Sequence, residues 1–232
     1  MKDHEEKDPV TGKTIRFIVT KGGKDMSKKR ATAMWHKEKG TIAWLRGMGS
    51  EDHLLDIGAN VGVYTMFAAV VMGAHVTAME PESLNFARLN QNIRANRVNG
   101  LVHAFPFAAS DRTEASFLKV GRFILGHSGH QVSRETPAKP EHIQGTWKTR
   151  IDSFHTTATH IKIDVDGEEP EVIDGMHGML DSKSLREIQC EIDTRNPAHR
   201  KIDDILHSYD FEKYKEETTR TDWMQNWRWR RG

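Results

Sequence analysis

The sequence of 232 residues contains a single cysteine, Cys190. One thiol cannot form an intramolecular disulfide, and it excludes a zinc site made of several thiolates. A chain that relies on no disulfide fits a reducing compartment. We therefore expect a cytoplasmic protein.

Long apolar runs are also missing. The longest, residues 66–74, is far shorter than the roughly 20 residues of a membrane-spanning helix. The first residues, MKDHEEKDPV, are densely charged and lack the apolar core of a secretory signal peptide. We expect no interaction with a membrane.

An excess of charge of either sign is absent as well. The 34 Lys and Arg residues offset 33 Asp and Glu residues, which leaves a net charge of +1 at pH 7. Total charge therefore gives no reason to expect nucleic-acid binding. The chain is long enough for one large domain or for a domain with an appendage, and it contains no internal repeat.

From His53 onward, short apolar segments alternate with segments of helical periodicity. The pattern predicts strands at 53–57, 75–80, 101–105, 160–165 and 186–192, and helices at 63–72, 83–96, 169–180 and 197–209. A turn and a further strand are expected within residues 110–120, and residues 121–146 are typical of a long loop. This alternation predicts an α/β fold with a doubly wound, mainly parallel sheet covered on both faces.

The N-terminal part does not share this pattern. Residues 14–19 predict a short strand, and residues 27–46 predict a helix that packs Trp35, Ile42 and Leu45. We divide the chain into an N-terminal extension, residues 1–45, placed to cover an acceptor site, and a main domain, residues 46–232.

Two basic clusters each allow two interpretations. Lys28, Lys29 and Arg30 are either a solvated helix start or a contact for an anionic acceptor. The C-terminal stretch NWRWRRG suggests nucleic-acid contact, but its period-two alternation of tryptophan and arginine is typical of a strand. We favour the solvated helix start for the first cluster and the strand for the C-terminal stretch.

The stretch LLDIGANVGVYT points to a ligand at the end of the first main strand. Gly58 and Gly62 let a ligand approach the backbone of the turn, and Glu80 ends the next strand, where its carboxylate can accept from a ribose diol. The order G-A-N-V-G puts Asn60 where a dinucleotide turn has its second glycine, and Asp56 would repel a diphosphate. A cofactor with a ribose, an amino-acid tail and no phosphate fits both features, and S-adenosylmethionine is such a cofactor.

Three segments together resemble the FkbM-type S-adenosylmethionine-dependent methyltransferases, a family of the class I, Rossmann-like methyltransferases. They are LLDIGANVGVYT (54–65), AMEPESLNFARLNQNI (78–93) and IKIDVDGEEPEVIDGM (161–176). The second segment carries the family pattern E-P-x-x-x-N-F, and AASD (108–111) and RIDSF (150–154) match shorter family motifs. Asp166 departs from the family, which usually has Glu there, and Pro170 replaces an apolar residue.

The resemblance implies the class I sheet of seven strands, in which residues 211–216 and 226–231 form a C-terminal antiparallel hairpin. It also implies a set of cofactor-binding residues. Asp56, Gly58 and Asn60 would line the methionine end, Glu80 would hold the ribose, and Ser110 and Asp111 would lie near the adenine. Asp164 would face the sulfonium region or the amino group, and Gly62, Pro81 and Asn85 complete the set.

A hydroxyl acceptor must lose a proton, and Asp164, Asp166 and Glu169 are the candidate bases. Acids in a first helical turn can instead offset the helix dipole, which we favour for Glu169. The 121–146 loop is a candidate acceptor lid, and His127 or His130 within it is an alternative base. We predict no metal site, because the histidines form no compact carboxylate–histidine motif.

These features predict an S-adenosylmethionine-dependent methyltransferase that acts on a hydroxyl of a small molecule or sugar. An RNA methyltransferase, or a nucleic-acid-binding protein that keeps this fold, is the alternative, although we do not expect a nucleic-acid partner. Asn60 and Asp56 disfavour an NAD-dependent oxidoreductase. The sequence leaves the acceptor and the oligomeric state open.

Overall fold

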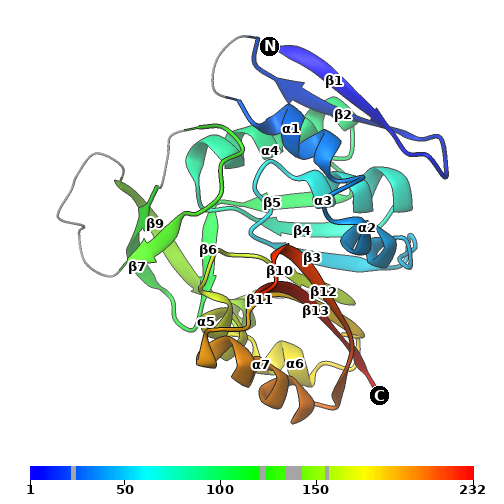
Figure 1. Cartoon of the computed structure of the whole chain (residues 1–232). Helices are drawn as coiled ribbons and strands as arrows, with labels where there is room; N and C mark the ends of the chain where they lie inside the picture. Colours follow the sequence, from blue (N-terminus) through cyan, green and yellow to red (C-terminus); the bar gives the residue numbers. More distant parts are fainter. Residues whose placement is uncertain (22–24, 121–123, 134–142, 155–156) are drawn as a thin grey trace.

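The protein is built around one seven-stranded sheet, shown in Figure 1 as a computed structural model that describes residues 1–21, 25–120, 124–133, 143–154 and 157–232. The strand order is β12-β13-β11-β10-β3-β4-β5. Five strands run parallel: β3 (His53–Ile57), β4 (His75–Met79), β5 (Val102–Phe105), β10 (His160–Ile163) and β11 (Glu187–Asp193). The predicted doubly wound, mainly parallel α/β fold is confirmed.

The C-terminal segment forms the predicted antiparallel hairpin. β12 (Phe211–Thr221) pairs with β13 (Met224–Arg231), and β13 pairs antiparallel with β11. Trp227 and Trp229 are buried, whereas Arg228 donates to Gln189 and forms an ion pair with Glu217. The strand interpretation of the tail is confirmed, because protein contacts account for both its aromatic and its basic side chains.

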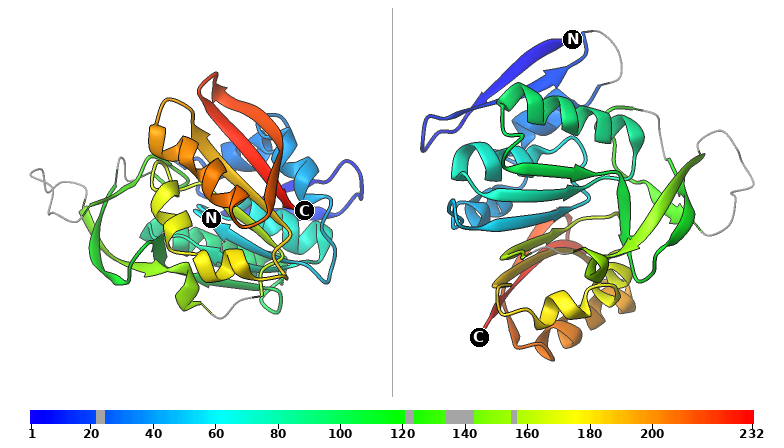
Figure 2. Two further views of the ribbon diagram at one scale, coloured as in Figure 1. Left: turned by 90° about the horizontal axis from the view of Figure 1, so that it is seen from below. Right: turned by 180° about the vertical axis from the view of Figure 1, so that it is seen from behind.

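Helices cover both faces of the sheet (Figures 1 and 2). One face carries α2 (Lys39–Leu45), α3 (Val63–Met66), the π-helical segment Phe67–Met72 and α4 (Ser83–Asn96); the other carries α5 (Glu169–Asp174), α6 (His177–Asp181) and α7 (Pro197–His207). Leu54 belongs to the first core and Leu55 to the second, because successive side chains of a strand point to opposite faces. None of the helices in the described ranges is long and apolar enough to cross a membrane.

Two helices predicted as continuous are each divided. Residues 27–46 form α1 (Ser27–Ala33) and α2, and in the turn between them Trp35 packs edge-on against Phe67 and donates to Glu6. The helix predicted at 169–180 stops at Asp174 and resumes at His177. At Gly175, between them, the backbone of Ser110 approaches so closely that a Cβ would lie 1.9 Å from its carbonyl oxygen.

The N-terminal residues form a hairpin of β1 (Lys2–Lys7) and β2 (Thr14–Val19). β1 has the sequence KDHEEK, so its hydropathy carries no strand signal. The hairpin lies beside α4 (Figure 2), where the side-chain oxygens of Asn92 and Asn96 accept from backbone N–H groups of β2, both at 2.8 Å. Phe17 of β2 is fully buried in the first core. The division of the chain at residue 45 stays a prediction.

A smaller sheet of order β6-β9-β7-β8 stands at the carboxyl end of β5. Its strands are β6 (Phe107–Ser110), β7 (Glu114–Lys119), β8 (Gln131–Ser133) and β9 (Ile143–Arg150), followed by a 3-10 turn at Ile151–Ser153. The segment predicted as a loop, 121–146, therefore contains β8 and the start of β9, while its residues 121–123 and 134–142 lie outside the described residues.

We predict that Gly175→Ala lowers the free energy of unfolding by about 1–3 kcal/mol, because the added methyl group meets the Ser110 carbonyl. Gly49→Ala is the control, since a Cβ at Gly49 meets no heavy atom of the described residues within 4 Å, and it should change stability by less than about 0.5 kcal/mol. Urea unfolding followed by circular dichroism measures both. Equal stability of the two variants would contradict the packing assigned to this position.

Candidate functional site

The turn after β3 contains two positions, Gly58 and Gly62, at which a side chain would collide with its neighbours. An added Cβ at Gly58 would lie 1.9 Å from the backbone oxygen of Asp164, and one at Gly62 would lie 2.4 Å from Cδ1 of Leu89. Both glycines also have positive φ angles, 82° and 83°, which other residues adopt only at a cost. Gly58 thus lets the ends of β3 and β10 meet, and Gly62 lets α4 pack against the turn.

Asn60 connects this turn to two other parts of the protein. Its φ of 54° is a left-handed conformation that asparagine tolerates better than most residues. Its backbone N–H donates to Oε2 of Glu80 at 2.8 Å, and its side-chain amide donates to the carbonyl of His127 at 2.8 Å. The turn is thereby tied to the end of β4 and to the segment that follows β7.

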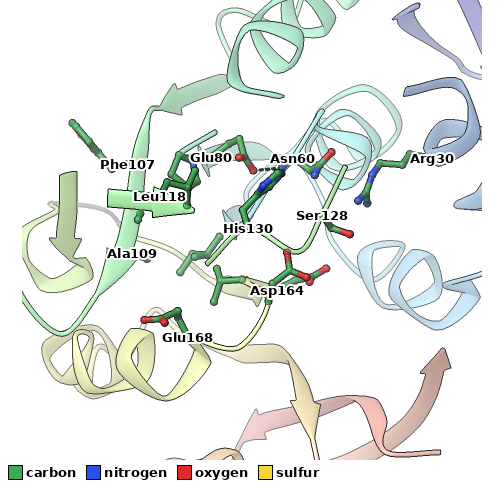
Figure 3. A pocket seen from close by; sticks show the side chains of 16 residues that line it. Arg30, Asn60, Glu80, Phe107, Ala109, Leu118, Ser128, His130, Asp164 and Glu168 are labelled. Atoms are coloured by element: carbon green, nitrogen blue, oxygen red, sulfur yellow. Dashed lines mark hydrogen bonds between the residues drawn. The ribbon is translucent and has the colours of Figure 1, made fainter. Parts of the chain in front are cut away.

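Glu80 is a buried carboxylate held by backbone groups. It is 5% exposed and accepts from the N–H groups of Asn60 and Glu82, each at 2.8 Å. Burial raises the pKa of Glu80 to about 7, although the two backbone hydrogen bonds act in the opposite direction. Since each carboxylate oxygen has two lone pairs, Glu80 can still accept from hydroxyl groups on its open side (Figure 3).

These groups border a cleft at the carboxyl edge of β3, β4 and β10, where parallel sheets bind ligands. Its volume is about 680 Å³, including the open mouth. Seven of the predicted site residues line it: Gly58, Asn60, Glu80, Pro81, Asp164, Asp166 and the alternative base His130.

One wall of the cleft is apolar and was not predicted from the sequence. Phe107 and Ala109 of β6 and Leu118 of β7 line it (Figure 3), and Pro81 is a further apolar residue of the lining. These side chains come from the smaller sheet, and their spacing in the sequence carries no signal of a shared wall. The AASD motif begins with two of the lining residues, Ala108 and Ala109. This motif is therefore the signal in the sequence that could have indicated the wall.

Ser110 and Asp111, the polar half of that motif, lie away from the lining of the cleft. Ser110 is buried where its carbonyl meets Gly175, and Asp111 forms an ion pair with Arg112 that lowers the pKa of Asp111 to about 2. Their assignment to the adenine stays a prediction.

Asp56 lies beneath α3 and outside the cleft lining. It is 1% exposed, and its Oδ2 accepts from the hydroxyl of Thr65 at 2.5 Å. Burial raises the pKa of Asp56, an effect that the charge of Lys162 opposes. Asp56 therefore supports the turn through its bond to Thr65 of α3. Its contact with the cofactor remains a prediction.

Asp164 and Lys162 form an ion pair at the end of β10. The two charged atoms are 3.0 Å apart, and the side chains are 26% and 3% exposed. The ammonium group of Lys162 lies 5.1 Å from the ring centre of Tyr64. Burial alone would lower the pKa of Lys162, but the carboxylates of Asp164 and Asp56 raise it. Lys162 thus stays charged and fixes the Asp164 carboxylate at the cleft.

Asp166 and Glu169 hold the backbone around them. Oδ2 of Asp166 accepts from the N–H of Gly129 at 2.6 Å. Glu169 accepts from the N–H groups of Val165 and Gly167 at 2.9 and 3.0 Å, and burial raises its pKa to about 7. Glu169 lies behind the loop, and its neighbour Glu168 lines the cleft.

A segment that we call the strap, residues 124–130, crosses between the cleft and the N-terminal part. Asn85 fixes it twice, since its side chain accepts from the N–H of Gly126 at 2.8 Å and donates to the carbonyl of His127 at 3.2 Å. Arg30 donates to the carbonyl of Gly126, and the backbone N–H of Met26 donates to the carbonyl of Leu125. Asn85 thus holds the strap over the cleft without lining it.

The two strap histidines have different surroundings. His130 lines the cleft, and burial lowers its pKa, so its imidazole is neutral at pH 7. His127 contributes its backbone carbonyl to Asn60 and Asn85. Within the described ranges, no group of three His, Cys, Asp or Glu side chains could hold a metal ion; His142 and His155 lie outside them.

We predict that Asn85→Ala loosens the strap, because it leaves the Gly126 N–H without its acceptor and removes one donor to His127. Hydrogen exchange in the peptide that covers the strap should become roughly tenfold faster. Asn90→Ala is the control: Asn90 lies on the same helix, and among the described residues its side chain bonds only to the carbonyl of Phe86 one turn earlier. Unchanged exchange in Asn85→Ala would show that other contacts hold the strap.

Comparison with known proteins agrees with this geometry. The sequence model of the methyltransferase FkbM domain matches residues 56–213. The hexuronic acid methyltransferase AglP of Haloferax volcanii is 29% identical over 164 residues, which are 68% of this chain and 65% of that protein. The chain thus spans somewhat less than two thirds of this relative.

Solved structures share the fold. A methyltransferase FkbM from Methylobacillus flagellatus superposes with a TM-score of 0.56 at 16% identity, over 78% of this chain and 44% of that chain. TYW2 of Pyrococcus horikoshii, solved in complex with MeSAdo, superposes with a TM-score of 0.52 at 15% identity, over 98% of this chain and 70% of that one. At these identities the likeness shows the fold alone.

The family match covers more than half of the chain and includes the glycine turn, Glu80 and the loop after β10. The sheet order and the C-terminal hairpin agree with it. The chain belongs to the FkbM methyltransferase family and has the class I methyltransferase fold.

Proposed function

We propose that this methyltransferase uses S-adenosylmethionine and methylates a hydroxyl group of a sugar or another small molecule. The observation that carries the proposal is the Glu80 carboxylate, which two backbone N–H groups fix at the edge of the cleft. Its free lone pairs suit a ribose diol, which offers two neighbouring hydroxyl donors.

The remainder of the cleft suits the other parts of this cofactor. The apolar wall of Pro81, Phe107 and Leu118 would take the adenine ring. Gly58 and Asp164 would face the methionine end, where the Asp164 carboxylate complements positive charge.

A dinucleotide fits this cleft less well. Its diphosphate would meet the carboxylates of Asp164, Asp166 and Glu168, and Arg30 is the one cationic side chain among the described lining residues. The cleft therefore favours a cofactor without phosphate groups, as the turn sequence does.

Bound S-adenosylmethionine supplies a methyl group that its positive sulfur already activates, so the protein mainly has to align the acceptor. Alignment accounts for about 7–11 kcal/mol of a barrier, whereas a general base contributes about 10²–10⁴-fold in rate. Asp164 is our candidate base, because its carboxylate is partly exposed at the cleft. We assign positioning roles to Asp166 and Glu169, whose oxygens accept from backbone N–H groups.

A sugar is the acceptor class that we favour. The named activity of the AglP relative concerns a hexuronic acid, and that relative is similar over 68% of this chain. A nucleic-acid acceptor had its main support in the C-terminal WRWRR stretch, whose arginines and tryptophans are taken up by β13 and its neighbours. An RNA transcript belongs in the activity assay as the competing acceptor.

We predict that the protein binds S-adenosylmethionine and that Glu80→Ala weakens this binding by roughly 10–100-fold, because one charged acceptor of two hydroxyl groups is lost. Titration calorimetry and the rise of the melting temperature with cofactor concentration measure the effect. Glu51→Ala, a change at an exposed acid, is the control. Absence of binding by the unmodified protein would refute the proposed function.

The raised pKa of Glu80 predicts a pH dependence of cofactor affinity. The free protein binds a proton at Glu80 below about pH 7, and the protonated carboxyl group accepts fewer hydrogen bonds. The affinity should therefore rise roughly tenfold between pH 6 and pH 8, as the ionised fraction rises. The slope should disappear in Glu80→Gln and persist in Glu169→Gln, although burial also raises the pKa of Glu169 to about 7. Calorimetry at several pH values tests this, and a slope retained in Glu80→Gln would contradict it.

A further inference from the structure

A second pocket adjoins the cofactor cleft. α1 and the turn after it line one side with Lys29, Arg30, Met34 and Glu38, and α3 lines the other with Val63 and Tyr64. Two residues, Arg30 of α1 and Ser128 of the strap, line both this pocket and the cleft. The two cavities therefore meet at these residues. α1 lies outside the family match, which begins at residue 56.

α1 is held firmly in this position. The buried residues Ala31 and Met34 pack it into the first core. Asp25, just before the helix, forms a buried ion pair with Arg88 of α4 at 3.0 Å and accepts from the N–H of Ser27. α1 therefore forms a preformed wall of the pocket.

The charges of the two cavities are opposite. The described lining of the cleft carries four acids, Glu80, Asp164, Asp166 and Glu168, against Arg30. The second pocket carries three cationic side chains, Lys29, Arg30 and Lys37, against Glu38 alone. The acidic cleft would thus attract a positively charged cofactor, and the basic pocket beside it would attract a negatively charged acceptor.

Lys29 and Arg30 are the side chains best able to hold an anion. Neither forms an ion pair with another residue in the described part of the chain. The Nε of Arg30 donates to the carbonyl of Gly126, which orients the guanidinium plane and leaves its outer N–H groups for a carboxylate or phosphate. Figure 3 shows Arg30 directed toward Ser128, at the junction of the cavities.

Tyr64 forms the wall opposite these cations. Burial, and next the Glu38 carboxylate, raise its pKa, so it stays a neutral phenol. Behind it lies Lys162, whose partner Asp164 lines the cofactor cleft. A molecule anchored at Lys29 and Arg30 would reach past Tyr64 toward Asp164, the candidate base.

We propose that this pocket is the acceptor site and that the acceptor carries an anionic group, a carboxylate or a phosphate, which Lys29 and Arg30 bind. The inference rests on the proposed function and narrows its acceptor class to acidic sugars or sugar phosphates. The anionic group sits under α1, and the hydroxyl that is methylated points to the junction with the cleft. The basic cluster at the start of α1 is then a binding element of this chain.

The test uses the full chain saturated with S-adenosylhomocysteine and three probes: glucuronate, glucose 6-phosphate and neutral glucose. Amide resonances are followed by NMR during each titration. We expect at least one anion, and not glucose, to shift the resonances of Lys29, Arg30, Tyr64 and Ser128. The anion that binds more tightly identifies the carboxylate or the phosphate as the natural group.

Lys29→Glu should weaken the binding of that anion by at least about tenfold. Lys28→Glu is the matched control: it changes the net charge equally, but Lys28 is exposed beside β1 and β2, outside the pocket. Equal weakening in both variants, shifts with glucose that match those with the anions, or no shift in the pocket with either anion would overturn the inference. Saturation with S-adenosylhomocysteine is measured first, and failure at that step would instead refute the proposed function.

Discussion

The site depends on the exclusion of a side chain at position 58. The backbone oxygen of Asp164 lies only 1.9 Å from where a Cβ would be, so β3 and β10 can end in contact. The turn that follows directs the N–H of Asn60 at Glu80, which ends the neighbouring strand. Glu80 and Asp164, which are 84 residues apart in the sequence, therefore line one cleft.

The carboxylates at the ends of β3 and β4 and in the segment after β10 have different roles, because each meets different neighbours. Glu80 opens onto the cleft, Asp56 is turned under α3 toward Thr65, and Glu169 ties the loop after β10. The acidic cleft then lies beside a basic pocket whose cations come from α1. This separation of charge lets a single fold place a cationic methyl donor against an anionic acceptor.

Hydrophobic periodicity was sufficient for most of the fold. It predicted the parallel strands, and α4 to the residue, because buried faces impose their period on the sequence. The C-terminal hairpin followed from the resemblance to the FkbM family. It missed β1, which has no apolar residue, and the strands β6, β8 and β9 of the smaller sheet. It also joined α1 to α2, and α5 to α6 across Gly175, where a neighbouring backbone interrupts the helix. These errors concern contacts between distant segments, which local patterns do not record.

The sequence by itself determined the sheet, the glycine turn and the acids that follow β3, β4 and β10, because each depends on residues close together in the chain. Tertiary structure alone decided which of those acids face the cleft, since burial and backbone donors differ at each strand end. It also decided that Phe107 and Leu118 form one wall, that Asn85 holds the strap, and that Arg30 reaches both cavities. The physical reason is that long-range packing, and not local spacing, brings these side chains together.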